Sequence, residues 1–84
     1  MAVVRLRLFA AAREAAGTAS DEFDAATVGD LLDAARARYG ERWAEIAATA
    51  RVWVNGDEPA AGAATTLAPD DEVAVLPPVS GGAF

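Results

Sequence analysis

The sequence predicts an α+β fold of two layers, in which one main helix packs against a mixed β-sheet. Three observations lead to this prediction. Residues 3–9 alternate between the two faces of an extended chain, as expected for a strand. Residues 27–40 carry apolar side chains at helical spacing. Residues 51–56 and 69–78 combine β-branched residues with turn signals, which is typical of further strands.

The first part of the chain is expected to form a strand, a short helix and a second strand. In VVRLRLF, one face of the strand holds Val4, Leu6 and Leu8, and the other holds Val3, Arg5, Arg7 and Phe9. The segment AAAREAAG then predicts one or two helical turns that end at Gly17. A short strand is expected around residues 19–25, centred on Phe23.

Residues 27–40, TVGDLLDAARARYG, form the clearest predicted helix. Thr27 is a suitable N-cap, Asp30 places an acid in the first turn, and Gly40 is a stop signal. The apolar positions at helical spacing are Val28, Leu31, Leu32, Ala35 and Tyr39. Residues 41–50 predict a further short helix, whose inward side chains are Trp43, Ile46 and Ala47.

The second half predicts strands separated by turns. RVWVNG, residues 51–56, runs into an Asn55-Gly56 turn. We expect a short strand and a loop within residues 57–68. A turn at Pro69-Asp70-Asp71 opens the last strand, which Pro77-Pro78 ends because proline has no N–H to donate. In that strand Val73 and Val75 face one way, and Ala74 and Leu76 face the other.

This order of elements predicts a β-grasp, or ubiquitin-like, roll. It requires a first hairpin, a crossing helix and a last strand near the middle of the sheet. Eighty-four residues suffice for one small domain, which we assign to residues 1–78, with residues 79–84 as a flexible tail.

Composition excludes several kinds of site. Cysteine and histidine are absent, so the chain offers no thiolate nucleophile, no Cys- or His-based metal site and no histidine-based triad. The net charge of −6 argues against nucleic acid as a partner. The negative charge favours a partner with a basic surface. The alternative is that it only reflects a soluble surface with an excess of acidic residues. No stretch approaches the roughly 20 apolar residues of a membrane span, and we expect a cytoplasmic protein.

The sequence ends in LPPVSGGAF, in which a diglycine follows a stiff segment. The segment consists of the Pro77-Pro78 pair, a Val79-Ser80 spacer and the Gly81-Gly82 pair. Backbone without side chains fits a narrow channel, and residues 79–82 span at most ~13–14 Å when extended. The alternative is an ordinary frayed chain end.

LPPVSGG, after PDDEVAV, resembles the end of the small sulfur-carrier proteins of the MoaD/ThiS family, which includes the small subunit of molybdopterin synthase. RLFAAAREAAGT is similar to the family's first strand and helical turn, TVGDLLDAARARYG to its helix, and VWVNG to its third strand. The resemblance covers nearly the whole chain and implies the same β-grasp fold.

The resemblance implies a carrier without catalytic side chains of its own. In such proteins an E1-like adenylyltransferase consumes ATP to adenylate the C-terminal glycine carboxylate, here that of Gly82, and sulfur then replaces the adenylate to give a thiocarboxylate. The carrier binds no cofactor. The acceptor partner would be the large subunit of molybdopterin synthase. Alternatives are a carrier for thiamine, cysteine or a secondary metabolite, a ubiquitin-like modifier, or a plain interaction module with an inert tail.

The chain departs from the family pattern because Ala83-Phe84 follows the diglycine. The resemblance to carriers with a short extension implies a processing peptidase that cuts between Gly82 and Ala83. The alternatives are a silenced paralogue or an engineered extension.

Other residues have expected roles at the root of the tail. The resemblance suggests an apolar docking patch of Phe9, Leu76 and Val79, with Pro77 and Pro78 beside it; core packing of Phe9 and Leu76 is the alternative. Arg13 is expected to contact the activating enzyme or the tail, or to be merely solvated. The acids of residues 70–72 predict a solvated turn rather than a metal site, since consecutive acids on a turn do not converge.

Overall fold

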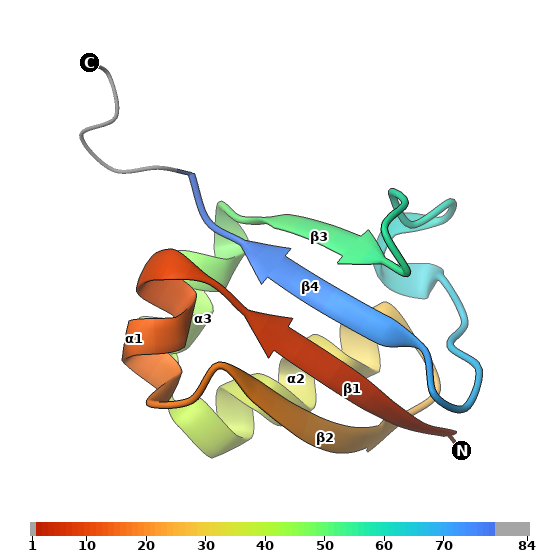
Figure 1. The fold of residues 1–84 in the computed structure, drawn as a ribbon, viewed down its shortest axis with the longest axis horizontal. Helices are drawn as coiled ribbons and strands as arrows, with labels where there is room; N and C mark the ends of the chain where they lie inside the picture. Colours follow the sequence, from red (N-terminus) through yellow and green to blue (C-terminus); the bar gives the residue numbers. More distant parts are fainter. Residues whose placement is uncertain (1, 79–84) are drawn as a thin grey trace.

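The computed structural model of the chain describes residues 2–78 (Figure 1). Its elements, in order, are β1 (Ala2–Leu8), α1 (Ala10–Ala16), β2 (Ser20–Ala25), α2 (Val28–Tyr39), α3 (Glu41–Ala48), β3 (Arg51–Val54), the 3₁₀ turn η1 (Gly62–Ala64) and β4 (Glu72–Leu76).

The four strands form one mixed sheet in the order β2-β1-β4-β3. β4, the last strand in sequence, lies in the interior of the sheet, parallel to β1 and antiparallel to β3. β1 and β2 form the first hairpin. This arrangement confirms the predicted β-grasp roll.

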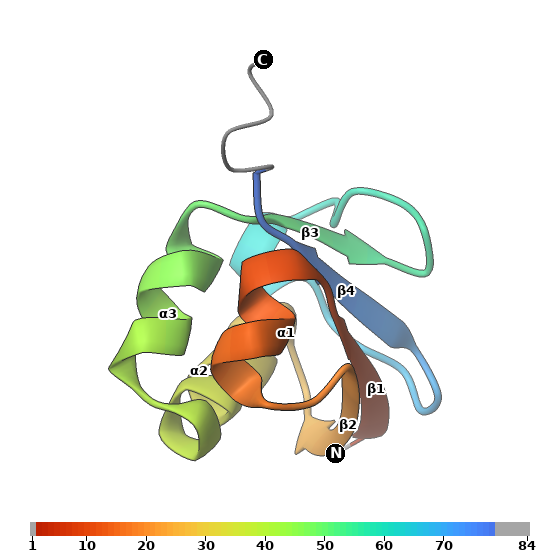
Figure 2. The same ribbon diagram turned by 60° about the vertical axis from the view of Figure 1, so that its left-hand side comes forward.

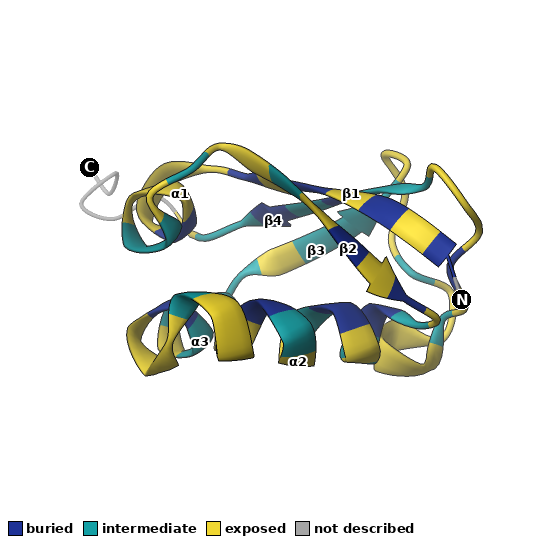
Figure 3. Cartoon of the chain, turned by 90° about the horizontal axis from the view of Figure 1, so that it is seen from below, coloured by how far each residue is buried: buried dark blue, intermediate teal, exposed yellow. Residues whose placement is uncertain are grey.

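The core lies between the sheet and the helices. α2 and α3 cover one face of the sheet, and the side chains of β1 alternate strictly between buried and exposed (Figure 3). The large side chains that are almost completely buried are Val4, Leu6, Leu8, Leu31, Trp43, Val73 and Val75. The inward faces predicted for the first and last strands are therefore confirmed.

The helix ends match the capping signals in the sequence. The Thr27 hydroxyl accepts a hydrogen bond from the Asp30 backbone N–H at 3.1 Å, which satisfies a donor in the first turn of α2. Gly17 ends α1 in the left-handed region, with φ of 77°. In α3 Trp43 is buried and Ile46 and Ala47 are half-buried, as predicted.

The short strand expected within residues 57–68 is wrong. The segment is a loop that contains η1, and its only ladder contacts within the described part of the chain are isolated bridges at Asp57 and Thr66. Pro59 lacks a donor, and the following alanines give no alternating apolar face that a strand could bury. The loop instead packs on α2 at Gly29, where an added Cβ would lie 3.1 Å from the Ala63 carbonyl oxygen.

Side-chain hydrogen bonds join the two turns that flank β3 and β4. The Asn55 amide donates to Asp71 Oδ1 at 2.9 Å, and Asn55 Oδ1 accepts from the Glu72 N–H at 2.9 Å. Asp71 Oδ2 accepts from the Ala68 N–H at 2.8 Å. These bonds hold two left-handed residues, Asn55 and Asp70, at φ of 52° and 69°.

Within residues 2–78, none of the helices combines the length and apolar character that crossing a membrane requires.

Candidate functional site

The segment expected to carry the reactive group lies outside the described residues. This applies to Gly82 and Gly81, to the spacer residues Val79 and Ser80, and to Ala83 at the expected cleavage point. The site can therefore be built only from its root, where the chain leaves the sheet at Pro78.

The topology brings four elements together at this exit. β1 and β4 are parallel, so the C-terminal ends of both strands lie at the same end of the sheet. α1 follows β1 at that end, and β3 begins there, with Arg51 opposite Leu76. Figures 1 and 2 show the chain leaving the end of β4 beside α1 and the start of β3, at the far end of the sheet from the N-terminus.

Figure 1 looks onto the face of the sheet that α2 and α3 leave uncovered, which we call the open face. The register places Trp53 beside Ala74, and Ala74 beside Arg7. One step nearer the exit, Arg51 lies beside Leu76. Together with Phe9 these residues form what we call the exit patch: Arg7, Phe9, Arg51, Trp53, Ala74 and Leu76.

Phe9 continues the outward face of β1 rather than entering the core. Its backbone is still extended, with φ of −130° and ψ of 154°, and its side chain is 39% exposed. The Arg7 guanidinium carbon lies 6.0 Å from the centre of the Phe9 ring, which places both side chains on the open face. Leu76 is half-buried and does not belong to the core cluster. Core packing therefore does not account for Phe9.

Trp53 belongs to the exit patch, although the sequence did not single it out. Its neighbours Val52 and Val54 pack against the core, so Trp53 points to the open face and is only half-buried. The signal was present in the sequence: in RVWV, strand alternation separates the tryptophan from the two valines. A tryptophan outside the core is an unusual use of a large apolar side chain in so small a domain.

The remaining expected residues lie at the same end of the molecule. Pro77 is half-buried and Pro78 is exposed. Arg13 is exposed on α1, where its carbonyl accepts from the Gly17 N–H at 2.9 Å. Its side chain makes no ion pair or hydrogen bond within residues 2–78, so the structure assigns it no partner there.

The acidic turn lies at the start of β4, opposite the exit. Asp71 uses both carboxylate oxygens for hydrogen bonds from Ala68 and Asn55, and these bonds lower the pKa of Asp71. Within residues 2–78, no group of three or more potential ligand side chains converges as a metal site would require. The Asp71 carboxylate thus has a structural role in holding the turn.

A second acid, Asp21, is half-buried against α2. The Tyr39 hydroxyl donates to Asp21 Oδ2 at 2.6 Å, and Arg38 Nη1 lies 3.0 Å from the same oxygen. The Tyr39 bond is the largest reason that the pKa of Asp21 is lowered, and burial together with Asp21 raises the pKa of Tyr39. The cluster fastens the end of α2 to β2.

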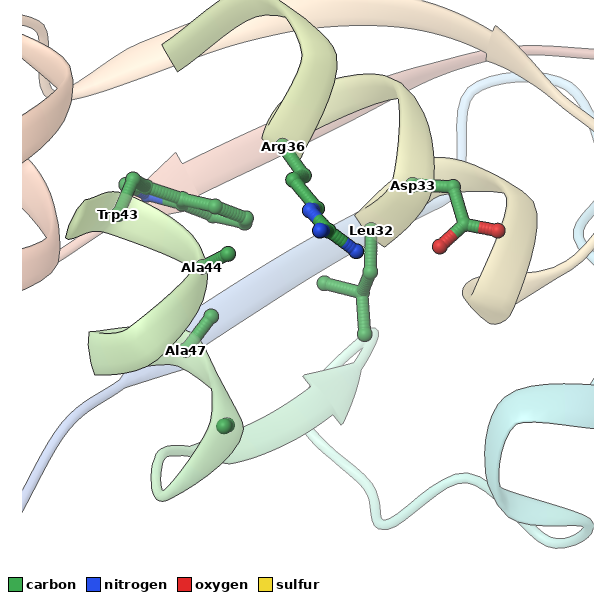
Figure 4. A pocket seen from close by; sticks show the side chains of 7 residues that line it. Leu32, Asp33, Arg36, Trp43, Ala44 and Ala47 are labelled. Carbon is green, nitrogen blue, oxygen red and sulfur yellow. The ribbon is translucent and has the colours of Figure 1, made fainter. Parts of the chain in front are cut away.

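A pocket of about 160 Å³ lies between α2 and α3, away from the open face (Figure 4). Its lining is mostly apolar, from Leu32, Trp43, Ala44 and Ala47, with Asp33 and Arg36 at its edge. Arg36 is bound to Glu41 at 2.7 Å. Nothing in this lining resembles a catalytic arrangement, so the candidate site is the chain exit with its patch.

Comparisons with known proteins bear on the family and the fold of the chain. The ThiS family model matches residues 6–82. No curated protein sequence matches the chain. Among solved structures, small archaeal modifier protein 1 (SAMP1) from Methanosarcina acetivorans is 32% identical, with a TM-score of 0.86 and 98% of each chain covered.

Two further structures are similar. One is a Pyrococcus furiosus protein provisionally assigned as subunit 1 of molybdopterin converting factor, which is 28% identical with a TM-score of 0.82 and coverage of 94% of this chain and 100% of that one. The other is Urm1 from Trypanosoma brucei, which at 14% identity and a TM-score of 0.73, with 95% of each chain covered, supports the fold alone. Since the family match spans nearly the whole sequence, the chain belongs to the ThiS family of small β-grasp proteins.

Proposed function

We propose that the chain is a sulfur carrier whose reactive group is the carboxylate of Gly82. The observation that carries this proposal is the extent of the family match, which runs through residue 82 and so includes both glycines. The exit patch supports the proposal, because it offers an activating enzyme a docking surface beside the point where the chain leaves the sheet.

The chemistry needs only main-chain atoms from this protein. A free α-carboxyl group is anionic at neutral pH and can attack the α-phosphate of ATP, with pyrophosphate as the leaving group. Hydrosulfide released by a sulfur donor then attacks the acyl-adenylate carbonyl carbon, AMP leaves, and loss of the S–H proton gives the thiocarboxylate that donates sulfur. This accounts for a sequence without cysteine or histidine, because the activating enzyme supplies the catalytic side chains.

Processing must precede activation. In the 84-residue chain the carboxyl group of Gly82 is tied up in the peptide bond to Ala83 and is not available as a nucleophile. We therefore propose that a peptidase hydrolyses the Gly82–Ala83 bond and releases Ala83-Phe84.

The acceptor is proposed to be the large subunit of molybdopterin synthase. Similarity to the P. furiosus protein over all of its length supports this branch of the family. Delivery of sulfur to another pathway uses the same carrier chemistry and differs only in the protein that receives the thiocarboxylate.

The test is activation in a defined mixture. A chain that ends at Gly82 is incubated with the E1-like adenylyltransferase, ATP and a sulfur donor, and its intact mass is measured. We expect a mass increase equal to replacement of one oxygen by sulfur. The matched control is the 84-residue chain, which should stay unchanged. If the mass of neither chain changes during the reaction, the proposal is contradicted.

A second candidate is a ubiquitin-like protein modifier. The observation that favours it is the 32% identity to SAMP1, a modifier protein by name, over 98% of both chains. It shares the activation step but ends in an isopeptide bond to lysines of other proteins. It predicts high-mass conjugates that resist reducing agents, whereas a carrier that only donates sulfur forms none. Because the chain has no lysine, its own side chains could not extend such a conjugate.

A further inference from the structure

The exit patch extends over three of the four strands, β3, β4 and β1, beside the departing chain. Five of its six side chains come from these strands, and the sixth, Phe9, directly follows the end of β1. The strand register sets Trp53, Ala74 and Arg7 in one row, and Arg51 with Leu76 in the row at the exit, where Phe9 lies one residue beyond the last β1–β4 pair. The patch therefore continues from the root of the reactive segment to the edge strand β3.

The patch differs in charge from the rest of the molecule. Acidic residues outnumber basic ones 13 to 7 in the sequence, yet the two rows contain two arginines and no acid. The next row holds Glu72, which pairs with Arg7 at 3.2 Å. Within residues 2–78, the ion-pair partner of Arg51 is Glu58 of the following loop, at 4.0 Å, with side chains that are 75% and 74% exposed. Such an exposed pair stabilises little and is easily exchanged for another carboxylate.

Trp53 is the largest side chain in the patch and does not belong to the core cluster or to the residues packed against it. Its neighbour across the ladder is Ala74, which carries only a methyl group and is followed in the row by Arg7. Tryptophan and arginine are among the residue types that contribute most to binding energy at protein interfaces. The place of Trp53 and Arg51 on an edge strand also lets a partner approach them without meeting a helix (Figure 1).

We propose that Trp53 and Arg51 are the specificity-determining residues through which this chain selects its activating enzyme. The matching surface of that enzyme would be apolar, with a carboxylate placed for Arg51. This inference rests on the proposed function, since it names the recognition element of that site. The indole would fill an apolar pocket of the enzyme, and the Arg51 guanidinium would leave Glu58 for the enzyme's carboxylate.

The test measures ATP–pyrophosphate exchange by the E1-like adenylyltransferase, with chains that end at Gly82 as substrates. We expect Trp53→Ala to raise KM for the carrier about tenfold or more, with kcat nearly unchanged, because only docking is lost. Arg51→Glu should raise KM similarly. Added salt should reduce the difference in KM between this variant and the unaltered chain, because salt screens the charge interaction. Trp53→Phe should restore part of the affinity.

Matched controls lie on the same face, away from the exit. Val3→Ala changes an apolar side chain that is 54% exposed, and Arg5→Glu changes the same charge as Arg51→Glu. Both should leave KM within about twofold of the unaltered chain, and thermal unfolding of each variant checks that it folds. If Trp53→Ala fails to fold, Trp53→Phe and Arg51→Glu carry the comparison.

The two ways of failing are distinct. If the KM for ATP–pyrophosphate exchange is the same for the unaltered chain, Trp53→Ala and Arg51→Glu, the docking role is overturned. The proposed function is then still intact. No exchange with the unaltered chain ending at Gly82 would contradict the proposed function itself.

Discussion

Side-chain hydrogen bonds of Asn55 and Asp71 join the turn after β3 to the turn before β4. Asn55 occupies a left-handed conformation that asparagine tolerates better than alanine does. We therefore expect Asn55→Ala to lower the free energy of unfolding by about 1–2 kcal/mol, from lost hydrogen bonds and backbone strain. Urea unfolding measures the change. Glu58→Ala, in the exposed loop that follows, is the control and should change little; equal effects would contradict the role of Asn55.

The lowered pKa values of Asp21 and Asp71 predict a definite acid sensitivity. A carboxyl group whose pKa is lower in the folded state stabilises that state above its unfolded pKa, and the contribution is lost as pH falls through the folded value. Both groups start from an ordinary pKa of 3.8. Stability should therefore fall as the pH drops below about 5, and titrating urea midpoints between pH 6 and 2 would show it.

Tyr39 gives this acid sensitivity a specific cause. The Tyr39 hydroxyl is the largest reason for the low pKa of Asp21. Tyr39→Phe removes that donor and should raise the pKa of Asp21, which an NMR titration of its carboxyl carbon would follow. An unchanged Asp21 pKa in this variant would show that the Glu22 N–H and Arg38, rather than Tyr39, keep it low.

At the scale of elements, the start of α2 is the best-defined helix end. Thr27 both caps the helix and bridges to Thr66 of the loop. Thr27→Ala should cost about 1 kcal/mol of unfolding free energy, and Thr27→Ser should cost much less because serine keeps the acceptor. Equal losses in the two variants would show that the methyl group, rather than the cap, is responsible.

The elements also show where sequence reasoning succeeds. β1 and β4 were predictable because their alternation is strict and one face is completely buried. α1 and α2 were predictable because glycines mark their ends. The segment 57–68 was not, since its conformation depends on packing against Gly29 rather than on its own pattern. Trp53 was missed as a patch residue because its significance depends on which strands become its neighbours, which the sequence does not state locally.

At the scale of the whole molecule, the fold places the chain exit, the exit patch and the start of β3 at one end. The expected docking roles of Phe9, Arg13, Leu76, Pro77 and Pro78 stay predictions, as do the domain boundary at residue 78 and the roles of residues 79–83. What the sequence could supply was the diglycine and the family pattern around it. What only the folded chain could supply was the parallel pairing of β1 with β4, which sets Phe9 and Leu76 at the same end of the sheet.

The central claim, that the carboxylate of Gly82 is the reactive group, is tested most directly by an intact-mass spectrum of the protein isolated from its own cells. We predict a species that ends at Gly82 with one carboxylate oxygen replaced by sulfur. That single result would establish both processing and carrier function. Finding only the 84-residue form, even when the activating enzyme and ATP are present, would contradict the claim and leave the chain as a binding module with a permanently covered diglycine.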